Sequence, residues 1–216
     1  MSEEKRFARR RFFQEGLREL LKPLSKAVEP MERAIRQFES LAAESKEKTP
    51  ALSSLPSVWL RPPGAIHPDS SFVDTCSRCR KCIEVCPAQC IDIDPNCQRG
   101  NGAPYIKPDE MACVVCEGLK CMHTCPTGAL SPIPIGEINM GTAVVNHQIC
   151  VRSRGEDCTI CIDTCPIGSV AIELRDAKVH VIEDGCIGCG VCQQQCPTEP
   201  KSIIVLSREV WEQRVR

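Results

Sequence analysis

Apolar residues near the start of the chain recur at alternating steps of four and three, a spacing that places them on one face of a helix. They are Leu17, Leu21, Leu24, Val28, Met31, Ile35, Phe38 and Ala42. Pro23 and Pro30 interrupt this pattern, because proline lacks a backbone N–H and favours a new helical start. We therefore expect residues 1–45 to form an amphipathic helical extension of two or three short pieces. It would pack either on its own domain or on a partner or membrane surface.

Residues 46–63 are rich in Ser, Lys, Glu and Pro and predict a linker, because such a stretch cannot bury a core. In residues 64–206, short apolar runs between turn residues predict strands. The runs are residues 90–93, 103–106, 129–130, 142–145, 170–174, 179–182 and 202–206. Residues 175–178 would form the turn of a hairpin. Residues 207–216 predict a short charged helical tail.

The loops between these strands carry most of the 18 cysteines. Sixteen fall into four runs, each with three cysteines and then a fourth that precedes a proline. The runs are Cys76, Cys79, Cys82 and Cys86; Cys113, Cys116, Cys121 and Cys125; Cys150, Cys158, Cys161 and Cys165; and Cys186, Cys189, Cys192 and Cys196. In a C-x2-C-x2-C-x3-C-P run, three cysteines bind one [4Fe–4S] cluster and the fourth binds another. The repeat therefore predicts an α+β fold of two fused bacterial ferredoxin-like units, with these sixteen cysteines as ligands of four [4Fe–4S] clusters.

Two other roles for clustered cysteines fit this spacing less well. Cysteines this close together are poorly placed for disulfides but well placed to share a soft metal centre. Zinc usually takes two separated ligand pairs, and the four histidines stand singly in the sequence. Two cysteines remain outside the runs. Cys90 is expected to be a small residue packed near a cluster. Cys97 is expected to be a free thiol, with a regulatory or ligand role as the alternative.

The spacing leaves open which runs share clusters. In an adjacent arrangement, the first run pairs with the second and the third with the fourth. In a nested arrangement, the first pairs with the fourth and the second with the third. We favour the adjacent arrangement, because the predicted hairpin between the third and fourth runs is short.

Basic residues lie within two of the runs: Arg78, Arg80 and Lys81 in the first, and Arg152 and Arg154 in the third. They could raise the potential of a nearby cluster or bind an acidic partner. They could equally be solvated surface charge.

Other features bear on the class of function. Gly188 and Gly190 would let backbone N–H groups approach cluster sulfurs. The net charge of −1 gives no support for nucleic-acid binding. We find no nucleophile–base pair, phosphate-binding glycine loop or nucleotide fingerprint. Full cysteine ligation would leave no open iron for a substrate, so we predict an electron carrier and not an enzyme. A maturation factor for another metalloenzyme and a zinc-based interaction module are the alternatives.

Four stretches together resemble the NapG/MauM family of ferredoxin-type proteins. They are residues 60–66 (Leu-Arg-Pro-Pro-Gly-Ala-Ile), the C-x2-C-x4-C-x3-C-P second run, residues 140–144 (Met-Gly-Thr-Ala-Val) and the stretched third run. The resemblance spans about residues 60–206. It implies four [4Fe–4S] clusters and electron transfer from a membrane quinol-oxidising partner toward a terminal reductase. In the nitrate-respiration branch of the family, that reductase is periplasmic nitrate reductase.

The arginines at positions 9–11 resemble the start of a twin-arginine export signal. An export signal also needs an uncharged apolar core, and each charge at its centre costs roughly 2.5–3.5 kcal/mol on insertion scales. Residues 14–33 carry eight charged side chains. We therefore expect the protein in the cytoplasm or on the cytoplasmic face of the membrane, with peripheral membrane contact through residues 1–45. Periplasmic location by twin-arginine export is the alternative.

Overall fold

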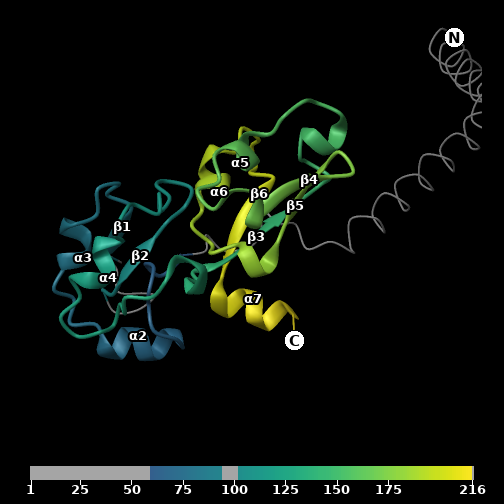
Figure 1. Ribbon diagram of the computed structural model, residues 1–216. Helices are drawn as coiled ribbons and strands as arrows, with labels where there is room; N and C mark the ends of the chain where they lie inside the picture. Colours follow the sequence, from purple (N-terminus) through teal and green to yellow (C-terminus); the bar gives the residue numbers. More distant parts are fainter. Residues whose placement is uncertain (1–58, 94–101, 216) are drawn as a thin grey trace, which may run out of the picture. The chain divides into compact units, whose positions relative to one another are not determined.

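A computed structural model of the chain describes residues 59–93 and 102–215 (Figure 1). These residues all belong to one compact unit, Leu52–Arg216. The predicted helical extension at residues 1–45 and Cys97 lie outside the described residues. Among the residues described, no helix is long and apolar enough to cross a membrane.

The first half of the described chain, residues 59–93 and 102–130, combines short helices with one hairpin. Its elements are α2 (Asp69–Thr75), α3 (Lys81–Glu84), β1 (Ile91–Ile93), β2 (Pro104–Ile106) and α4 (Lys120–His123). β1 and β2 are antiparallel, with Ile91 opposite Ile106. Two isolated bridges, Leu60 with Ile106 and Ala65 with Leu130, connect the beginning of this half to its hairpin and to its end.

The second half, residues 141–215, contains longer strands. Its elements are β3 (Gly141–Val145), α5 (Ile160–Asp163), β4 (Ile172–Arg175), β5 (Lys178–Val181), α6 (Val191–Gln195), β6 (Ile203–Ser207) and α7 (Arg208–Val215). It also contains single 3-10 turns at η3 (Arg152–Arg154), η4 (Gly168–Val170) and η5 (Glu183–Gly185), and another, η2 (Ile135–Glu137), lies in the connection between the two halves. β4 and β5 form an antiparallel hairpin, and β3 pairs antiparallel with β6. The helix predicted for the C-terminal segment is present as α7.

Both halves follow one plan, as the internal repeat of the sequence predicts. In each half a hairpin lies between the two cysteine runs, and a second pairing joins the beginning of the half to its end. Each cysteine loop leads into a short helix that carries the third cysteine of its run. These cysteines are Cys82 in α3, Cys121 in α4, Cys161 in α5 and Cys192 in α6. α3 packs against α4, and α5 packs against α6.

Two predicted boundaries are wrong, and the strand expected at residues 129–130 is present only as the single bridge between Leu130 and Ala65. The linker was expected to continue to residue 63, but Leu60, Pro62 and Pro63 are fully buried. The backbone of Leu60 also exchanges two hydrogen bonds with Ile106, so this segment is part of the folded domain. A strand was expected to begin at Val170, but Val170 ends a 3-10 turn and is 64% exposed. The strand begins two residues later, where an apolar side chain can be buried.

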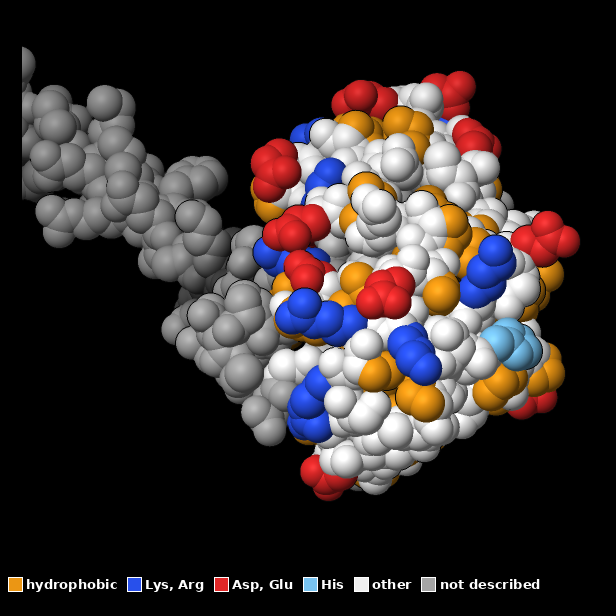
Figure 2. All heavy atoms as spheres, turned by 90° about the vertical axis from the view of Figure 1, so that its left-hand side faces the viewer, with side chains coloured by type: hydrophobic (Ala, Val, Ile, Leu, Met, Phe, Trp, Pro, Cys, Tyr) orange, Lys and Arg blue, Asp and Glu red, His pale blue; other side chains and the backbone are white. Residues whose placement is uncertain are grey.

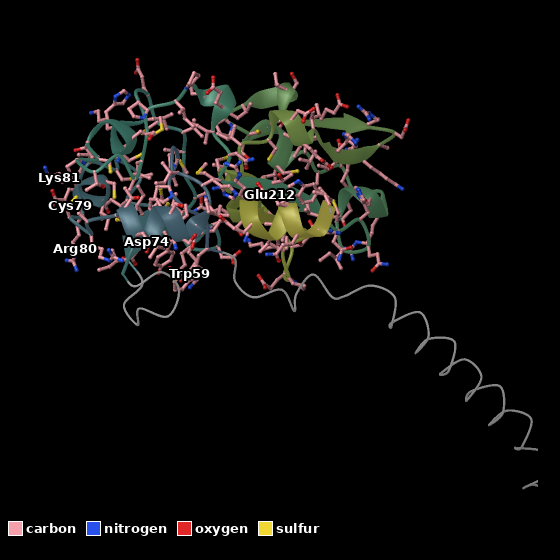
Figure 3. The ribbon with its side chains drawn as sticks, turned by 90° about the horizontal axis from the view of Figure 1, so that it is seen from below. Trp59, Asp74, Cys79, Arg80, Lys81 and Glu212 are labelled. Carbon is pink, nitrogen blue, oxygen red and sulfur yellow. The ribbon has the colours of Figure 1, made fainter. Side chains whose placement is uncertain are left out.

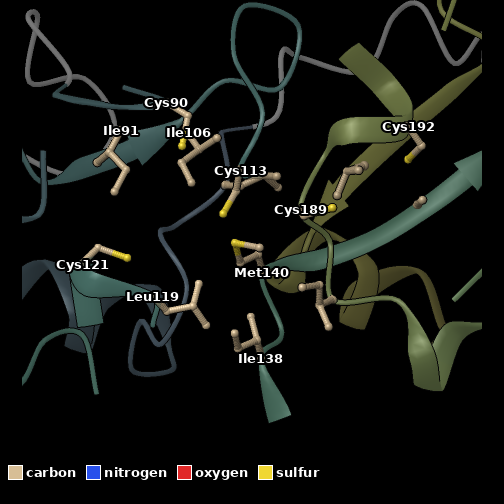
Figure 4. Packing of buried hydrophobic residues seen from close by; sticks show 14 of the residues in the cluster. Cys90, Ile91, Ile106, Cys113, Leu119, Cys121, Ile138, Met140, Cys189 and Cys192 are labelled. Atoms are coloured by element: carbon tan, nitrogen blue, oxygen red, sulfur yellow. The ribbon is translucent and has the colours of Figure 1, made fainter. Parts of the chain in front are cut away.

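The core is small and contains many cysteines. Buried aliphatic residues such as Leu119, Ile138 and Met140 lie between cysteines of the two halves (Figure 4). In the first half, Phe72 is fully buried and Trp59 stacks on Tyr105 with ring centroids 4.0 Å apart. With so little apolar bulk, cofactor bonds are expected to supply much of the stability.

Candidate metal centres

The cysteines of the four runs line four separate hollows. Site I is lined by Cys76, Cys79, Cys82 and Cys125, and site II by Cys86, Cys113, Cys116 and Cys121. Site III is lined by Cys150, Cys158, Cys161 and Cys196, and site IV by Cys165, Cys186, Cys189 and Cys192. Each hollow therefore combines the first three cysteines of one run with the fourth cysteine of another run.

The runs combine within each half, as in the adjacent arrangement. Sites I and II share the first and second runs, and sites III and IV share the third and fourth. The proline after each fourth cysteine turns the chain, and that cysteine faces the neighbouring site. The nested arrangement would need the first and fourth runs to meet around one hollow. The hollows described here do not combine these runs.

Backbone N–H groups point at the first sulfur of three runs. Arg78 donates from its backbone N to the Sγ of Cys76 at 3.4 Å. At the corresponding positions of the second and fourth runs, the backbone groups of Val115 and Gly188 act to lower the pKa of the first cysteines, Cys113 and Cys186. This geometry requires a left-handed backbone, and φ is +58°, +51° and +74° at the three residues. Only the fourth run uses glycine, so the first two hold a strained non-glycine residue at a binding loop.

The two glycines of the fourth run have different roles. The backbone of Gly188 contacts a cluster-site sulfur, as the sequence suggested. Gly190 instead makes room for a neighbouring loop, because a Cβ there would lie 2.7 Å from the side chain of Pro108. The residue also begins α6 with a φ of +88°, which favours glycine.

Burial makes most of these thiols hard to ionise. It raises the pKa of Cys82 and Cys161 to about 11 and that of Cys121 and Cys189 to about 12, and neighbouring cysteines in the thiolate form add to the shift. Without a bound cation, the four thiols are therefore protonated at neutral pH. A bound iron centre supplies the positive charge that stabilises the thiolates, and binding then releases protons. The donor set is soft and all-sulfur, which fits iron–sulfur ligation.

Two of the fourth cysteines accept hydrogen bonds that offset their burial. At Cys125 burial alone would raise the pKa, but the backbone N of Leu130, at 3.4 Å, and other donors lower it overall. At Cys196 the hydroxyls of Thr198 and Ser202, each 3.2 Å from Sγ, have the same effect. These hydrogen-bonding groups were not predicted from the sequence. A Cys-Pro-Thr sequence in the second and fourth runs was the available signal.

Cys90 is buried and lines site II beside the four cysteines of that site. Its Sγ lies 3.6 Å from the Sγ of Cys86. The interaction between the Cys90 and Cys113 thiols lowers the pKa of Cys113 and raises that of Cys90. The residue therefore packs against a candidate cluster site, as expected for a small side chain at this position.

The basic residues of the first run divide into two kinds. The guanidinium of Arg78 turns back and donates to the carbonyl oxygens of Cys76 at 2.6 Å and Val73 at 3.2 Å. Arg80 and Lys81 are exposed and lie near the exposed Cys79 (Figure 3). Figure 2 shows this face, where basic, acidic and apolar side chains alternate. Of these three residues, Arg80 and Lys81 are therefore the two that present their charge to solvent.

Both arginines of the third run form ion pairs with nearby residues. Arg152 pairs with Asp157, and Arg154 lies 4.0 Å from Glu156. Their charge is therefore locally neutralised by acidic residues of the same inserted segment. This segment offers no excess positive charge of the kind found near Cys79.

The four hollows fit a multi-iron cofactor. Around one metal ion, ligand atoms converge on a point, whereas around a cubane each sulfur reaches a different iron. Within residues 59–93 and 102–215, no three His, Cys, Asp or Glu side chains converge closely enough to hold one ion. Each hollow instead carries four run cysteines around its wall, and Cys90 is a fifth at site II.

Comparisons with known proteins agree with this geometry. The 4Fe-4S dicluster domain matches twice, at residues 75–129 and 135–199, and each match contains the two runs of one half. The methylamine utilization ferredoxin-type protein MauM of Paracoccus denitrificans is 35% identical over 163 residues, which cover 70% of this chain and 72% of the relative. MauM of Methylophilus methylotrophus is 37% identical over 166 residues, with the same coverage.

The ferredoxin-type protein NapG of Escherichia coli is 34% identical over 164 residues, which cover 69% of this chain and 71% of the relative. These similarities and the two dicluster domains confirm the resemblance that the Arg-Pro-Pro-Gly segment and the cysteine runs suggested. The chain belongs to the NapG/MauM family of ferredoxin-type proteins, which carry [4Fe–4S] clusters and transfer electrons instead of catalysing a reaction.

Proposed function

We propose that this protein relays single electrons through four [4Fe–4S] clusters, one at each of sites I to IV. The observation that carries the proposal is the grouping of all sixteen run cysteines, four by four, around four hollows. A [4Fe–4S] cluster supplies one-electron chemistry when bound. The two dicluster domains support a count of four.

The residues around each site would hold the cofactor and set its potential. The short helices α3 to α6 fix the third cysteine of every run, and the prolines direct the fourth toward the neighbouring site. Hydrogen bonds to Cys125 and Cys196 stabilise negative charge on sulfur, which favours the reduced form at sites I and III. Buried aliphatic side chains exclude water from the spaces between sites.

Iron analysis tests the four-cluster proposal. Anaerobically reconstituted protein should hold about sixteen irons and as many inorganic sulfides per chain. Cys82→Ser should lose or convert one cluster, whereas Cys90→Ala and Cys97→Ser should keep all four. About eight irons per chain, or stoichiometric zinc, would contradict the proposal.

The electron donor is proposed to be a membrane quinol-oxidising partner and the acceptor a terminal reductase. The relationship to NapG and MauM supports this assignment. Stopped-flow mixing with candidate partners tests it, because a carrier should be reduced and reoxidised within one partner turnover. Oxidation much slower than partner turnover would instead favour a maturation factor.

We place the protein on the cytoplasmic face of the membrane, with residues 1–45 as its peripheral contact. The support is the helical spacing of the apolar residues in this stretch of sequence, together with its many charged side chains. Deleting residues 1–45 should leave iron content unchanged and move the protein from the membrane-associated to the soluble fraction. Recovery of a processed native protein from the periplasm would contradict this placement.

A further inference from the structure

A backbone hydrogen bond joins cysteines that belong to sites in different halves. The N–H of Cys113, at site II, donates to the carbonyl oxygen of Cys189, at site IV, with an N–O distance of 3.0 Å. The two residues lie side by side between the halves in Figure 4. The route between their sulfurs therefore runs Sγ–Cβ–Cα–N–H···O=C–Cα–Cβ–Sγ, with no solvent gap.

This junction is buried. Cys113 is 6% exposed and Cys189 is 8% exposed. The neighbouring Met140 and Ile187 are each 4% exposed, and a second backbone hydrogen bond joins them at 3.0 Å. Electron tunnelling falls steeply with distance and proceeds better along bonds than across gaps, so a buried bonded route favours transfer.

A loop of the first half is held against α6 next to the junction. Gln193 is 6% exposed, and its Nε2 donates to Asp109 Oδ1 at 2.7 Å. Its Oε1 accepts from the backbone N of Val205 at 2.7 Å, so the side chain links this loop to β6. Gly190 lets Pro108 approach the start of the same helix. These contacts hold the backbones of Cys113 and Cys189 at hydrogen-bonding distance.

Helix packing inside each half shows which site lies next to site II and which lies next to site IV. α3, which carries a site I cysteine, packs against α4, which carries a site II cysteine. α5 and α6 connect sites III and IV in the same way. Sites II and IV are therefore the inner pair, and sites I and III are the ends.

We propose that electrons cross between the two halves at the Cys113–Cys189 junction, so that the four sites are used in the spatial order I, II, IV, III. This inference rests on the proposed four-cluster function. Each step oxidises one site by one electron and reduces its neighbour by one electron, and no proton or atom is transferred. A one-electron protein donor and acceptor would exchange electrons with the end sites. At site I the exposed Cys79, Arg80 and Lys81 suit a partner with an acidic surface.

Magnetic coupling between reduced clusters tests this order in the full chain. The double variant Cys79→Ser with Cys158→Ser leaves sites II and IV intact. The matched variant Cys116→Ser with Cys186→Ser leaves sites I and III. After reduction with dithionite, the first should show an EPR spectrum split or broadened by spin–spin interaction. The second should show two independent signals. Coupling between I and III without coupling between II and IV would overturn the proposal.

Single variants keep the test decisive if a double variant does not fold. Cys186→Ser removes the inner site IV and should leave site III magnetically isolated while sites I and II stay coupled. Cys158→Ser removes the end site III and should leave I, II and IV coupled. Site III still coupled to site I or II after loss of site IV would overturn the order.

Iron content separates failure of the order from failure of the proposed function. Wild-type protein with about sixteen irons but no coupling between II and IV would refute the order alone. Wild-type protein with about half that content would refute the four-cluster relay itself.

Discussion

The two halves of the protein share one arrangement of elements, but they differ in the backbone pairing that joins the beginning of each half to its end. In the second half β3 and β6 pair along their whole length, from Gly141 opposite Ser207 to Val145 opposite Ile203. In the first half the equivalent pairing is the single bridge between Ala65 and Leu130. The second half therefore has a backbone ladder where the first half has almost none.

Side chains compensate for the missing ladder in the first half. Arg61 donates from Nε and Nη2 to the two carboxylate oxygens of Asp69, at 2.5 and 3.0 Å. Its Nη1 donates to the carbonyl oxygen of Pro104 at 3.0 Å, and its guanidinium lies 5.0 Å from the ring centroid of Phe72. The side chain of Arg61 thus joins the segment before α2 to α2 itself and to β2.

The hairpin of the second half also has a tighter connection than the hairpin of the first half. β4 and β5 are joined by Asp176 and Ala177, whose φ values of +50° and +58° give the twisted two-residue turn that suits a hairpin. β1 and β2 are joined by a longer connection, most of which lies outside the described residues. The comparison indicates that the first half depends more on its side-chain contacts and cofactors, and the second more on backbone pairing.

Removal of iron should have the largest effect on this comparison. Without metal–thiolate bonds both halves should lose most of their protection, because the core is small. During partial removal with a chelator, strands β1 and β2 should lose hydrogen-exchange protection before β3 and β6. Mass-spectrometric exchange on the two pairs of strands measures this order, and reconstitution with iron and sulfide is the control. Earlier loss in β3 and β6 would contradict our interpretation.

Arg61→Ala should produce the next largest effect. The side chain is only 15% exposed, and its loss leaves Asp69 and the Pro104 carbonyl without a donor, so we expect a cost of about 2–3 kcal/mol. Arg61→Lys should recover only part of this, because lysine lacks the planar fork. Anaerobic urea unfolding of the reconstituted protein measures both.

The second half offers a matched control for Arg61→Ala. Arg175 pairs with Glu173 but is 58% exposed, so Arg175→Ala should change stability by no more than about 0.5 kcal/mol. If Arg61→Ala and Arg175→Ala lowered the free energy of unfolding equally, Arg61 would have no special role in stability.

Ala177→Gly should have the smallest effect, and it should be stabilising. Alanine is strained at a φ of +58°, and glycine relieves this strain in a turn that already suits the hairpin. We expect the free energy of unfolding to rise by roughly 0.5–1 kcal/mol from the relieved strain, reduced by the higher entropy of glycine in the unfolded chain. Ala171→Gly is the control, because Ala171 is buried with a φ of −104° and should lose stability. A lower urea midpoint for Ala177→Gly would contradict the prediction.

Local patterns in the sequence determined the parts of this protein that depend on near neighbours. The spacing of the cysteine runs predicted a repeated α+β unit, and short apolar runs between turn residues predicted β1 to β6 to within a few residues. Sulfur ligation of [4Fe–4S] clusters follows from the same spacing, because three ligands lie within one loop. The family was also recognisable from short motifs.

Tertiary structure alone decided how these parts combine. The fourth cysteine of each run has no local partner, so only packing shows that Cys125 faces site I and Cys196 faces site III. Only the packing showed that Leu60 and Arg61 lie inside the fold. The sequence did not show it, because this segment has the composition of a linker and its contacts lie far along the chain. The Cys113–Cys189 junction depends on a close approach at Gly190 and a buried Gln193, and neither residue type signals such a contact by itself. Contacts between distant residues depend on how the two halves fit together, and spacing along the chain does not record that fit.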